Sequence, residues 1–232
     1  MTTAEKLAKV AENREKLYEA GKNAENDAFW DEITQKGERT VYFQGFAYWG
    51  SEYIRPNRKI IITSSNGMSQ TFMHSPNLKK VEKDYFDASQ KPIGTRNEYS
   101  YNYTFYNCVV LEEIEDIGLQ AEFNYNYTFA SCHSLHTIAK IRTDENTLFT
   151  ESFIRCDVLE NIVFEGFIGT NLDMRYSPKL THDSLMSIIN ALKDYSADTS
   201  GTTRKLTIGS ANIAKLTQDE LEIIYNKGWN VA

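Results

Sequence analysis

One pattern of residues recurs at a constant spacing in the middle of this chain. Each copy places Phe, Cys, Leu and Ile at intervals of three residues, and three copies begin 24 residues apart, at Phe105, Phe129 and Phe153. A related copy begins at Phe72, and a decayed copy begins at Met174, 21 residues after Phe153. A period of this length predicts a solenoid, in which each unit buries its apolar edge only against the next unit.

Alignment of the copies on Phe separates the positions that we expect inside from those that we expect outside. The residue four places earlier is large and apolar in every copy, which predicts core, and the residue two places earlier varies in polarity, which predicts exposure. Thr or Ser comes directly before Phe. Because alternation of buried and exposed positions is typical of strands, we expect a strand around each Phe.

A second sheet is predicted after the Leu position of each unit. There the neighbours of the buried Val or Ile are of mixed type, and they are expected to project outward. None of them is constant among the units, so we expect neither a ladder of charges nor a ladder of metal ligands. The projecting residues are Lys80, Glu113, Thr137 and Asn161 before the buried residue, and Glu82, Glu115, Ala139 and Val163 after it.

The cysteines of the chain all fall at one place of the repeat. We expect Cys108, Cys132 and Cys156 to be reduced and to act as small buried hydrophobes, with Ser in the outer copies. A zinc site needs close cysteine pairs, which the sequence lacks. His133 and His136 flank Cys132, but such a fragment alone is more typical of exposed loop histidines, so no metal site is predicted.

The Phe-x-x-Cys-x-x-Leu-x-x-Ile pattern, over residues 66–180, resembles the BspA-like class of leucine-rich repeats. The resemblance implies a parallel, strand-bearing solenoid that serves binding and adhesion and carries out no chemistry. The final segment, from Ser184 to Ala232, is similar to the ending of such proteins encoded in bacterial prophages. The expected fold is therefore an α/β repeat, a leucine-rich-repeat solenoid with parallel strands.

Three parts are expected along the chain. Residues 1–35 are predicted to form a helical arm, residues 36–180 the solenoid with an irregular first rung at 37–62, and residues 181–232 an α/β cap over the last rung. The apolar stripe of the arm is thin, so the arm should either pack on the first rung or pair with copies of itself in a homo-oligomer.

Local signals predict short elements at both ends of the repeat. Ile60 to Ile62 are expected to form a strand, and the extra residues between Val81 and Tyr99 a loop insertion. Towards the end of the chain, Thr181 and Thr217 are each expected to cap a helix, with a strand between them over residues 206–208.

Composition and motifs argue against several classes of function. The formal charge is −7 and no run of basic residues occurs, so nucleic acid is not an expected partner. No apolar run approaches ~20 residues, so no membrane insertion is expected. The first residues lack the apolar core of a signal peptide, so the protein is expected to be virion-associated or cytoplasmic before release.

Catalytic motifs are also missing from the sequence. It contains no nucleophile elbow, zinc-protease helix, phosphate loop or calcium loop. A glycosidase would need two carboxylates facing each other across a cleft, whereas the acidic residues from Glu112 to Asp116 lie along one predicted strand edge and a loop. We expect those residues to form a solvated face, and we expect a protein that is not an enzyme and needs no cofactor.

Tyrosine and asparagine are the residues most suggestive of binding. Asn102-Tyr103 and Asn126-Tyr127 hold the same places in adjacent units, so the two tyrosines should lie one over the other. Tyrosine offers rigid amphipathic contact area, although these side chains could instead only cover the flank of the solenoid. The candidate binding surface comprises Asn102, Tyr103, Asn126 and Tyr127, with Glu113, Glu115, Thr137 and Asn161 on the second sheet.

Two functional hypotheses follow from these observations. The first is a non-enzymatic recognition or adhesion module, a phage- or prophage-encoded tail or surface protein that binds a glycan or protein of a host envelope. The second is an intracellular or structural scaffold for a protein partner, with residues 1–35 as the docking element.

Overall fold

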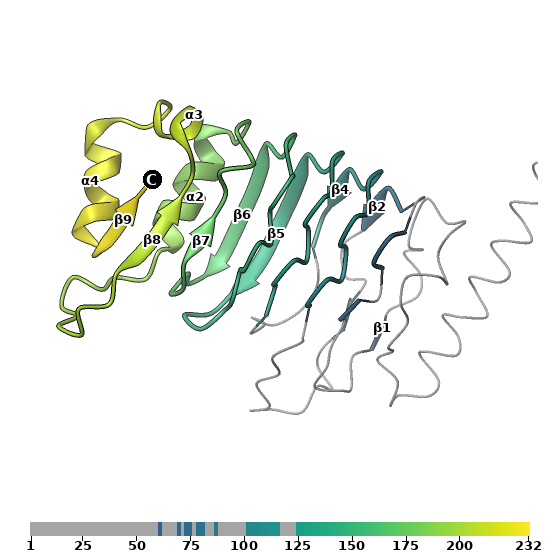
Figure 1. The fold of residues 1–232 in the computed structure, drawn as a ribbon, viewed down its shortest axis with the longest axis horizontal. Coiled ribbons are helices and arrows are strands. Elements are labelled where there is room, and N and C mark those ends of the chain that lie inside the picture. Colours follow the sequence, from purple (N-terminus) through teal and green to yellow (C-terminus); the bar gives the residue numbers. More distant parts are fainter. Residues whose placement is uncertain are drawn as a thin grey trace, which may run out of the picture.

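The computed structural model describes residues 60–61, 69–70, 72–75, 78–81, 86–87, 101–116 and 124–232. Parallel strands and a few helices give this part of the chain an α/β character (Figure 1). The predicted arm at 1–35 lies outside the described residues, as does the predicted first rung at 37–62 apart from β1 (Ile60–Ile61). β1 pairs in parallel with β3 (Phe86–Asp87), a short strand that falls within the predicted loop insertion.

Four parallel strands form the sheet that was predicted after the Leu positions. They lie in chain order, so each unit adds one strand beside the strand of the unit before it (Figure 1). The register sets Val81 opposite Ile114 and continues that row from unit to unit, with every residue of the row fully buried. The strands are β2 (Lys80–Val81), β4 (Glu113–Ile114), β5 (Thr137–Thr143) and β6 (Asn161–Gly166).

Aromatic rings stack along the core from one unit to the next. The ring of Phe105 lies 5.5 Å from that of Phe72 and 6.0 Å from that of Phe129, and Phe153 continues the row at 5.4 Å. The large residues four places before Phe form a second row, in which the Tyr101 and Tyr125 rings are 5.1 Å apart. Both rows are buried, as the alignment of the repeats predicted.

The stretch around each Phe is a run of turns, so the prediction of a strand there is wrong. The N–H of Phe105 donates to the carbonyl of Thr128 in the next unit, as in a sheet, but the N–H of Thr104 bonds locally to the Tyr101 carbonyl. Residues in the left-handed region, two places before and two places after Phe, turn the chain so that hydrogen bonds between units alternate with local ones. The side chains then alternate between buried and exposed, as they would in a strand. The left-handed residues are Gln70, His74, Tyr103, Asn107, Tyr127, Ser131, Glu151 and Arg155.

Buried hydroxyl and thiol groups tie each unit to the one before it. The Thr128 hydroxyl donates to the Tyr101 carbonyl at 2.6 Å, and the Ser152 hydroxyl donates to the Tyr125 carbonyl at 2.7 Å. Thr128 and Ser152 are fully buried, so their hydroxyl groups need hydrogen-bond partners, and the carbonyl groups of the preceding unit supply them. The cysteines are free and buried, as predicted.

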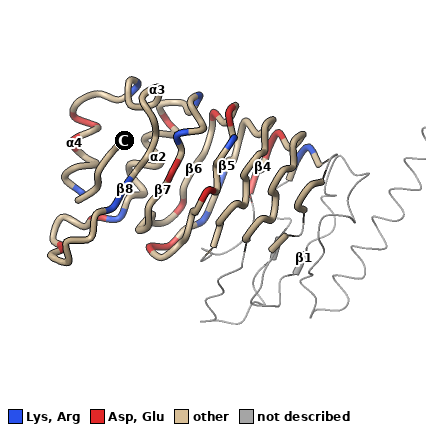
Figure 2. Tube along the Cα trace, viewed as in Figure 1, with Lys and Arg blue, Asp and Glu red and all other residues tan. Residues whose placement is uncertain are grey.

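One member of the predicted solvated acidic face is buried. Asp116 is only 5% exposed, and both of its carboxylate oxygens accept from the Arg142 guanidinium, at 2.8 and 3.1 Å. The Tyr125 hydroxyl donates to the Arg142 carbonyl at 3.1 Å. The prediction failed for Asp116 because its partner lies in the next unit, whereas Glu112 is exposed as expected. Acidic and basic residues are interspersed along the described tube (Figure 2).

The C-terminal part combines a further parallel sheet with three helices. Its helix caps confirm the sequence signals: Thr181 accepts from the Ser184 N–H, and Thr217 forms a capping box with Glu220. Ile224 of the last helix is buried, whereas Ile223 is exposed. The elements are β7 (Leu172–Asp173), α2 (His182–Ala191), β8 (Arg204–Thr207), α3 (Ser210–Ile213), α4 (Gln218–Asn226) and β9 (Trp229–Val231), with sheet order β7-β8-β9.

Helix α2 packs against β6, the last strand of the four-stranded sheet (Figure 1). The hydroxyl of Ser184 accepts from the Ile162 N–H and that of Ser187 accepts from the Phe164 N–H, each at 2.9 Å. Unpaired N–H groups on an edge strand can form hydrogen bonds with another chain. The two serine hydroxyls accept from the N–H groups of Ile162 and Phe164, so these groups are not available to another strand.

Candidate functional site

Asn102, Tyr103, Asn126 and Tyr127 together form what we call the tyrosine face. The rings of Tyr103 and Tyr127 lie parallel, with centroids 4.6 Å apart and an interplanar angle of 3°. Both tyrosines are partly exposed, and the ring of Tyr106 meets Tyr103 edge-on at 5.3 Å. The structure therefore brings the predicted pair together as a stack of two partly exposed rings.

The backbone fixes both tyrosines in place. Tyr103 and Tyr127 have φ angles of 58° and 56°, in the left-handed region. Their N–H groups donate to the carbonyls of Asn126 and Thr150 in the following units, at 3.1 and 2.9 Å. A left-handed backbone costs free energy in non-glycine residues, and these hydrogen bonds between units help to offset that cost. The aromatic pair is consequently set before any ligand arrives.

Asn126 has a structural role on this face. Its side-chain oxygen accepts from the N–H of Thr150 in the next unit at 2.7 Å. Its own N–H donates to the side chain of Asn124 at 2.7 Å. The asparagine therefore supports the tyrosines more than it offers hydrogen bonds to a ligand, which differs from the role that the sequence suggested.

Desolvation raises the pKa of the Tyr103 hydroxyl, and the nearby Tyr127, Tyr106 and Glu151 act in the same direction. Because an ordinary tyrosine already titrates near about 10, this hydroxyl stays protonated at neutral pH. It can then donate as well as accept a hydrogen bond.

Three sheet residues of the candidate surface, Glu113, Thr137 and Asn161, lie side by side on β4, β5 and β6, and Glu115 follows β4. The register pairs Glu113 with Thr137 and Thr137 with Asn161. Glu113 and Glu115 both form ion pairs with Lys80, the first at 3.2 Å, and their hydrogen bonds raise the Lys80 pKa, with Glu115 the larger cause. Lys80, Glu113 and Glu115 thus form a local ion-pair cluster. The sequence had predicted no continuous ladder of charges, and it did not predict this cluster.

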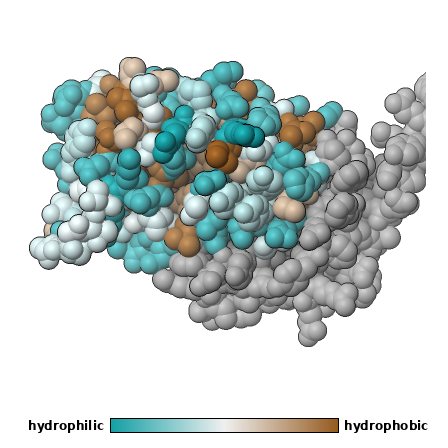
Figure 3. All heavy atoms as spheres, viewed as in Figure 1, coloured by the Kyte–Doolittle hydropathy of each residue, from teal (hydrophilic) through white to brown (hydrophobic). Residues whose placement is uncertain are grey.

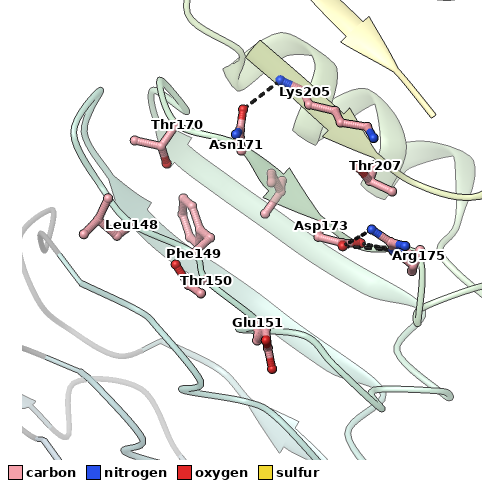
Figure 4. A pocket seen from close by; sticks show the side chains of 11 residues that line it. Leu148, Phe149, Thr150, Glu151, Thr170, Asn171, Asp173, Arg175, Lys205 and Thr207 are labelled. Carbon is pink, nitrogen blue, oxygen red and sulfur yellow. Dashed lines mark hydrogen bonds and ion pairs between the residues drawn. The ribbon is translucent and has the colours of Figure 1, made fainter. Parts of the chain in front are cut away.

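A cleft that the sequence reasoning did not predict lies beyond the tyrosine face, between the last full copy and the decayed copy. It has a volume of about 470 Å³. One side is formed by residues 148–151 and the other by residues 170–173 and Arg175, with Lys205 and Thr207 from β8 (Figure 4). The shortened spacing of 21 residues between Phe153 and Met174 is the signal that could have indicated an irregular junction.

Charged groups stand on both sides of the cleft. Arg175 is paired with Asp173, with its Nη2 at 2.7 Å and its Nε at 2.9 Å from one carboxylate oxygen, and this contact raises the Arg175 pKa (Figure 4). Lys205 donates its backbone N–H to the Asn171 side chain at 2.8 Å. Glu151 is exposed, and it forms no ion pair with any residue that the structure describes. The cleft therefore offers charges of both signs.

The described residues offer few other candidates. None of their His, Cys, Asp and Glu side chains gather in groups of three that could hold a metal ion. No helix in the described ranges has the length and apolar composition needed to cross a bilayer. On the side shown in Figure 3, apolar residues form small patches separated by polar ones. No protein family, curated protein or solved structure matches the chain.

Proposed function

We propose that this chain is a non-enzymatic recognition module of the leucine-rich-repeat solenoid type. In this proposal it binds a glycan or protein of a host envelope through the tyrosine face. The observation that carries the proposal is the Tyr103–Tyr127 stack, which is partly exposed and held by a fixed backbone.

The stack suits recognition because its side chains lose little conformational entropy when a ligand binds. Binding normally requires side chains to lose rotamer freedom, at about 0.5–1.5 kcal/mol for each one immobilised. Tyr103 and Tyr127 already restrain each other. Their ring faces can contact the apolar face of a sugar or a hydrophobic side chain, and their hydroxyls can bond to polar groups at the rim.

A binding assay on the intact protein tests this proposal. A panel of bacterial envelope glycans and envelope proteins would be screened with the unaltered chain and with Tyr103→Ala/Tyr127→Ala. Tyr225→Ala is the matched control, because Tyr225 is 48% exposed on α4. We expect at least one component to bind, with the double variant weakened at least about tenfold, or ~1.4 kcal/mol, and the control unchanged.

The proposal fails if no envelope component binds, or if the double variant and Tyr225→Ala bind alike. Thermal unfolding of each variant shows whether a loss of binding only reflects a loss of folding. The proposed location is a phage particle, or the cytoplasm before release, and antibody labelling of purified particles tests it.

The alternative function is a scaffold for a protein partner. Its docking element was expected in residues 1–35, which lie outside the described residues. A different feature favours a protein ligand, namely the cleft beside Glu151. A pull-down that succeeds with the full chain and fails when the cleft is blocked would support this alternative.

A further inference from the structure

A regular ladder of backbone hydrogen bonds joins the units on the side that carries the tyrosine face. In each unit the N–H two places before Phe donates to the carbonyl three places before the next Phe. Because one bond recurs at the same place of every unit, a unit that lacks it stands out. The three described bonds of this kind run from Gln70 to Asn102 at 2.9 Å, from Tyr103 to Asn126 at 3.1 Å and from Tyr127 to Thr150 at 2.9 Å.

The ladder is open between the last full copy and the decayed copy. Glu151 and Asn171 hold the places of donor and acceptor, yet the Glu151 N–H and the Asn171 carbonyl form no backbone hydrogen bond within the described part of the chain. Backbone pairing resumes one unit later, where Leu172, which holds the place two before Met174, pairs with Leu206 in the β7–β8 sheet. At the Phe place of the same unit the Met174 N–H donates to the Thr207 carbonyl at 2.7 Å. The opening is therefore confined to one junction.

The cleft lies at this junction. Glu151 and Asn171 are both exposed and line it from opposite sides (Figure 4). Phe149, two residues before Glu151, also lines it, and its N–H likewise has no backbone acceptor among the described residues. Free donors thus recur at every second residue along one side of the cleft, which is the period of an extended chain.

We propose that this cleft binds an extended peptide segment of a protein partner, which completes the open ladder between Glu151 and Asn171. An extended peptide presents carbonyl and N–H groups to both sides, so one residue accepts from Glu151 while the next donates to Asn171. Open backbone edges are used in this way when a peptide adds to a sheet. A sugar has hydroxyl groups but no such two-residue period.

The charge of the cleft adds a preference for the peptide sequence. The Glu151 carboxylate is exposed and has no ion pair among the described residues, whereas Asp173 is already neutralised by Arg175. A basic residue of the peptide pairs with Glu151, and the exposed Lys205, which also lines the cleft, can pair with an acidic one. This inference is independent of the tyrosine face, since the cleft can bind a peptide whether or not the tyrosines bind a glycan.

The test uses the full chain and a library of linear peptides. Thr150→Trp places an indole in the cleft at a residue whose own side chain is exposed and forms no described bond. Ala139→Trp is the matched control, because Ala139 is exposed on β5, away from the cleft. We expect selected peptides to contain a basic residue, to bind Thr150→Trp at least about tenfold more weakly, and to bind Ala139→Trp within about twofold of the unaltered chain. Glu151→Gln should weaken them about two- to fivefold, because an exposed ion pair contributes little.

Amide hydrogen exchange measures whether a bound peptide forms a hydrogen bond with the Glu151 N–H. In the free protein the Glu151 amide should exchange faster than those of Tyr103 and Tyr127, and a bound peptide should slow it at least about tenfold, since a hydrogen-bonded amide exchanges only on opening. The proposal is overturned if no peptide prefers the unaltered chain to Thr150→Trp, or if bound peptides leave Glu151 exchange unchanged. It is also overturned if light scattering shows a dimer of the unaltered chain that Thr150→Trp abolishes, because a second copy of this chain would then fill the cleft.

Discussion

The thiol of Cys132 donates a hydrogen bond to the carbonyl oxygen of Phe105, at 3.1 Å and in the preceding unit. Cys108 and Cys156 make the same contact with Phe72 and Phe129, at 2.9 and 3.1 Å. Each cysteine is fully buried. The repeated cysteine is therefore a small donor that fits a narrow slot, and Ser75 and Ser177 fill the same slot in the outer copies.

Thiol reagents should modify the three cysteines only after denaturation. Burial raises the pKa of Cys108 and Cys156 to about 12, and it also raises the pKa of Cys132, with the neighbouring thiols adding to the effect. The thiolate is the reactive form, so native labelling is expected to be slow. Mass spectrometry of the protein after brief labelling measures this, and rapid native labelling of all three would contradict the repeat alignment.

Stability should fall in alkaline solution because of these thiols. A thiol whose pKa is raised on folding stabilises the protein below its ordinary pKa of about 8.5, and that contribution is lost as the pH rises towards the folded value. The free energy of unfolding should drop by up to about 1.4 kcal/mol per pH unit for each thiol. Urea denaturation from about pH 8 to about pH 10 measures the slope, and Cys132→Ala should make it shallower.

Phe129→Ala should be far more damaging than Cys132→Ala. The Phe129 ring lies between those of Phe105 and Phe153, so its removal opens a cavity and should cost about 3–5 kcal/mol. Cys132→Ala removes one small group and should cost about 1 kcal/mol. Urea denaturation measures both losses of unfolding free energy. Equal losses for the two variants would show that the aromatic stack stabilises the core no more than the thiol does.

Arg142→Gln should destabilise the protein by about 3 kcal/mol, because it removes the guanidinium that binds both oxygens of the buried Asp116 carboxylate. The double variant Arg142→Gln/Asp116→Asn removes the charge as well and should recover part of the loss. A double-mutant cycle measured by denaturation checks this. If the two single losses simply add, the pair is not coupled.

Arg155→Val should cost about 1–2 kcal/mol, whereas Arg155→Gly should be close to neutral. Arg155 is exposed with a φ of 58°, where a β-branched residue is strained and glycine is not. Urea midpoints of the two variants give the comparison. A neutral valine would mean that the turn is not left-handed in solution.

The sequence predicted the buried positions of this fold better than its backbone. Phe129, Cys132 and their equivalents could be placed because burial recurs with the repeat. The strand expected around Phe129 was wrong because left-handed turns give the same alternation of buried and exposed residues. A sequence pattern indicates which side chains are buried. It does not distinguish a strand from a run of left-handed turns that buries the same side chains.

The candidate site was predicted only in part, for a related reason. Tyr103 and Tyr127 could be paired because their equivalence follows from the repeat. The cleft lies where Glu151 and Asn171 face each other across a junction at which the repeat is shortened. The shortened spacing marks the place, but it does not predict the cleft or its lining. Asp116 was misjudged because its ion pair with Arg142 spans two units at unrelated positions.

The most direct test of recognition by the tyrosine face is a titration of tyrosine-labelled protein, followed by ring resonances in NMR spectra. An envelope component that binds should shift the ring signals of Tyr103 and Tyr127 and leave that of Tyr225 on α4 unchanged. Saturable shifts confined to the pair are the result that the proposed function predicts. A component that binds while the two rings stay unmoved would contradict it.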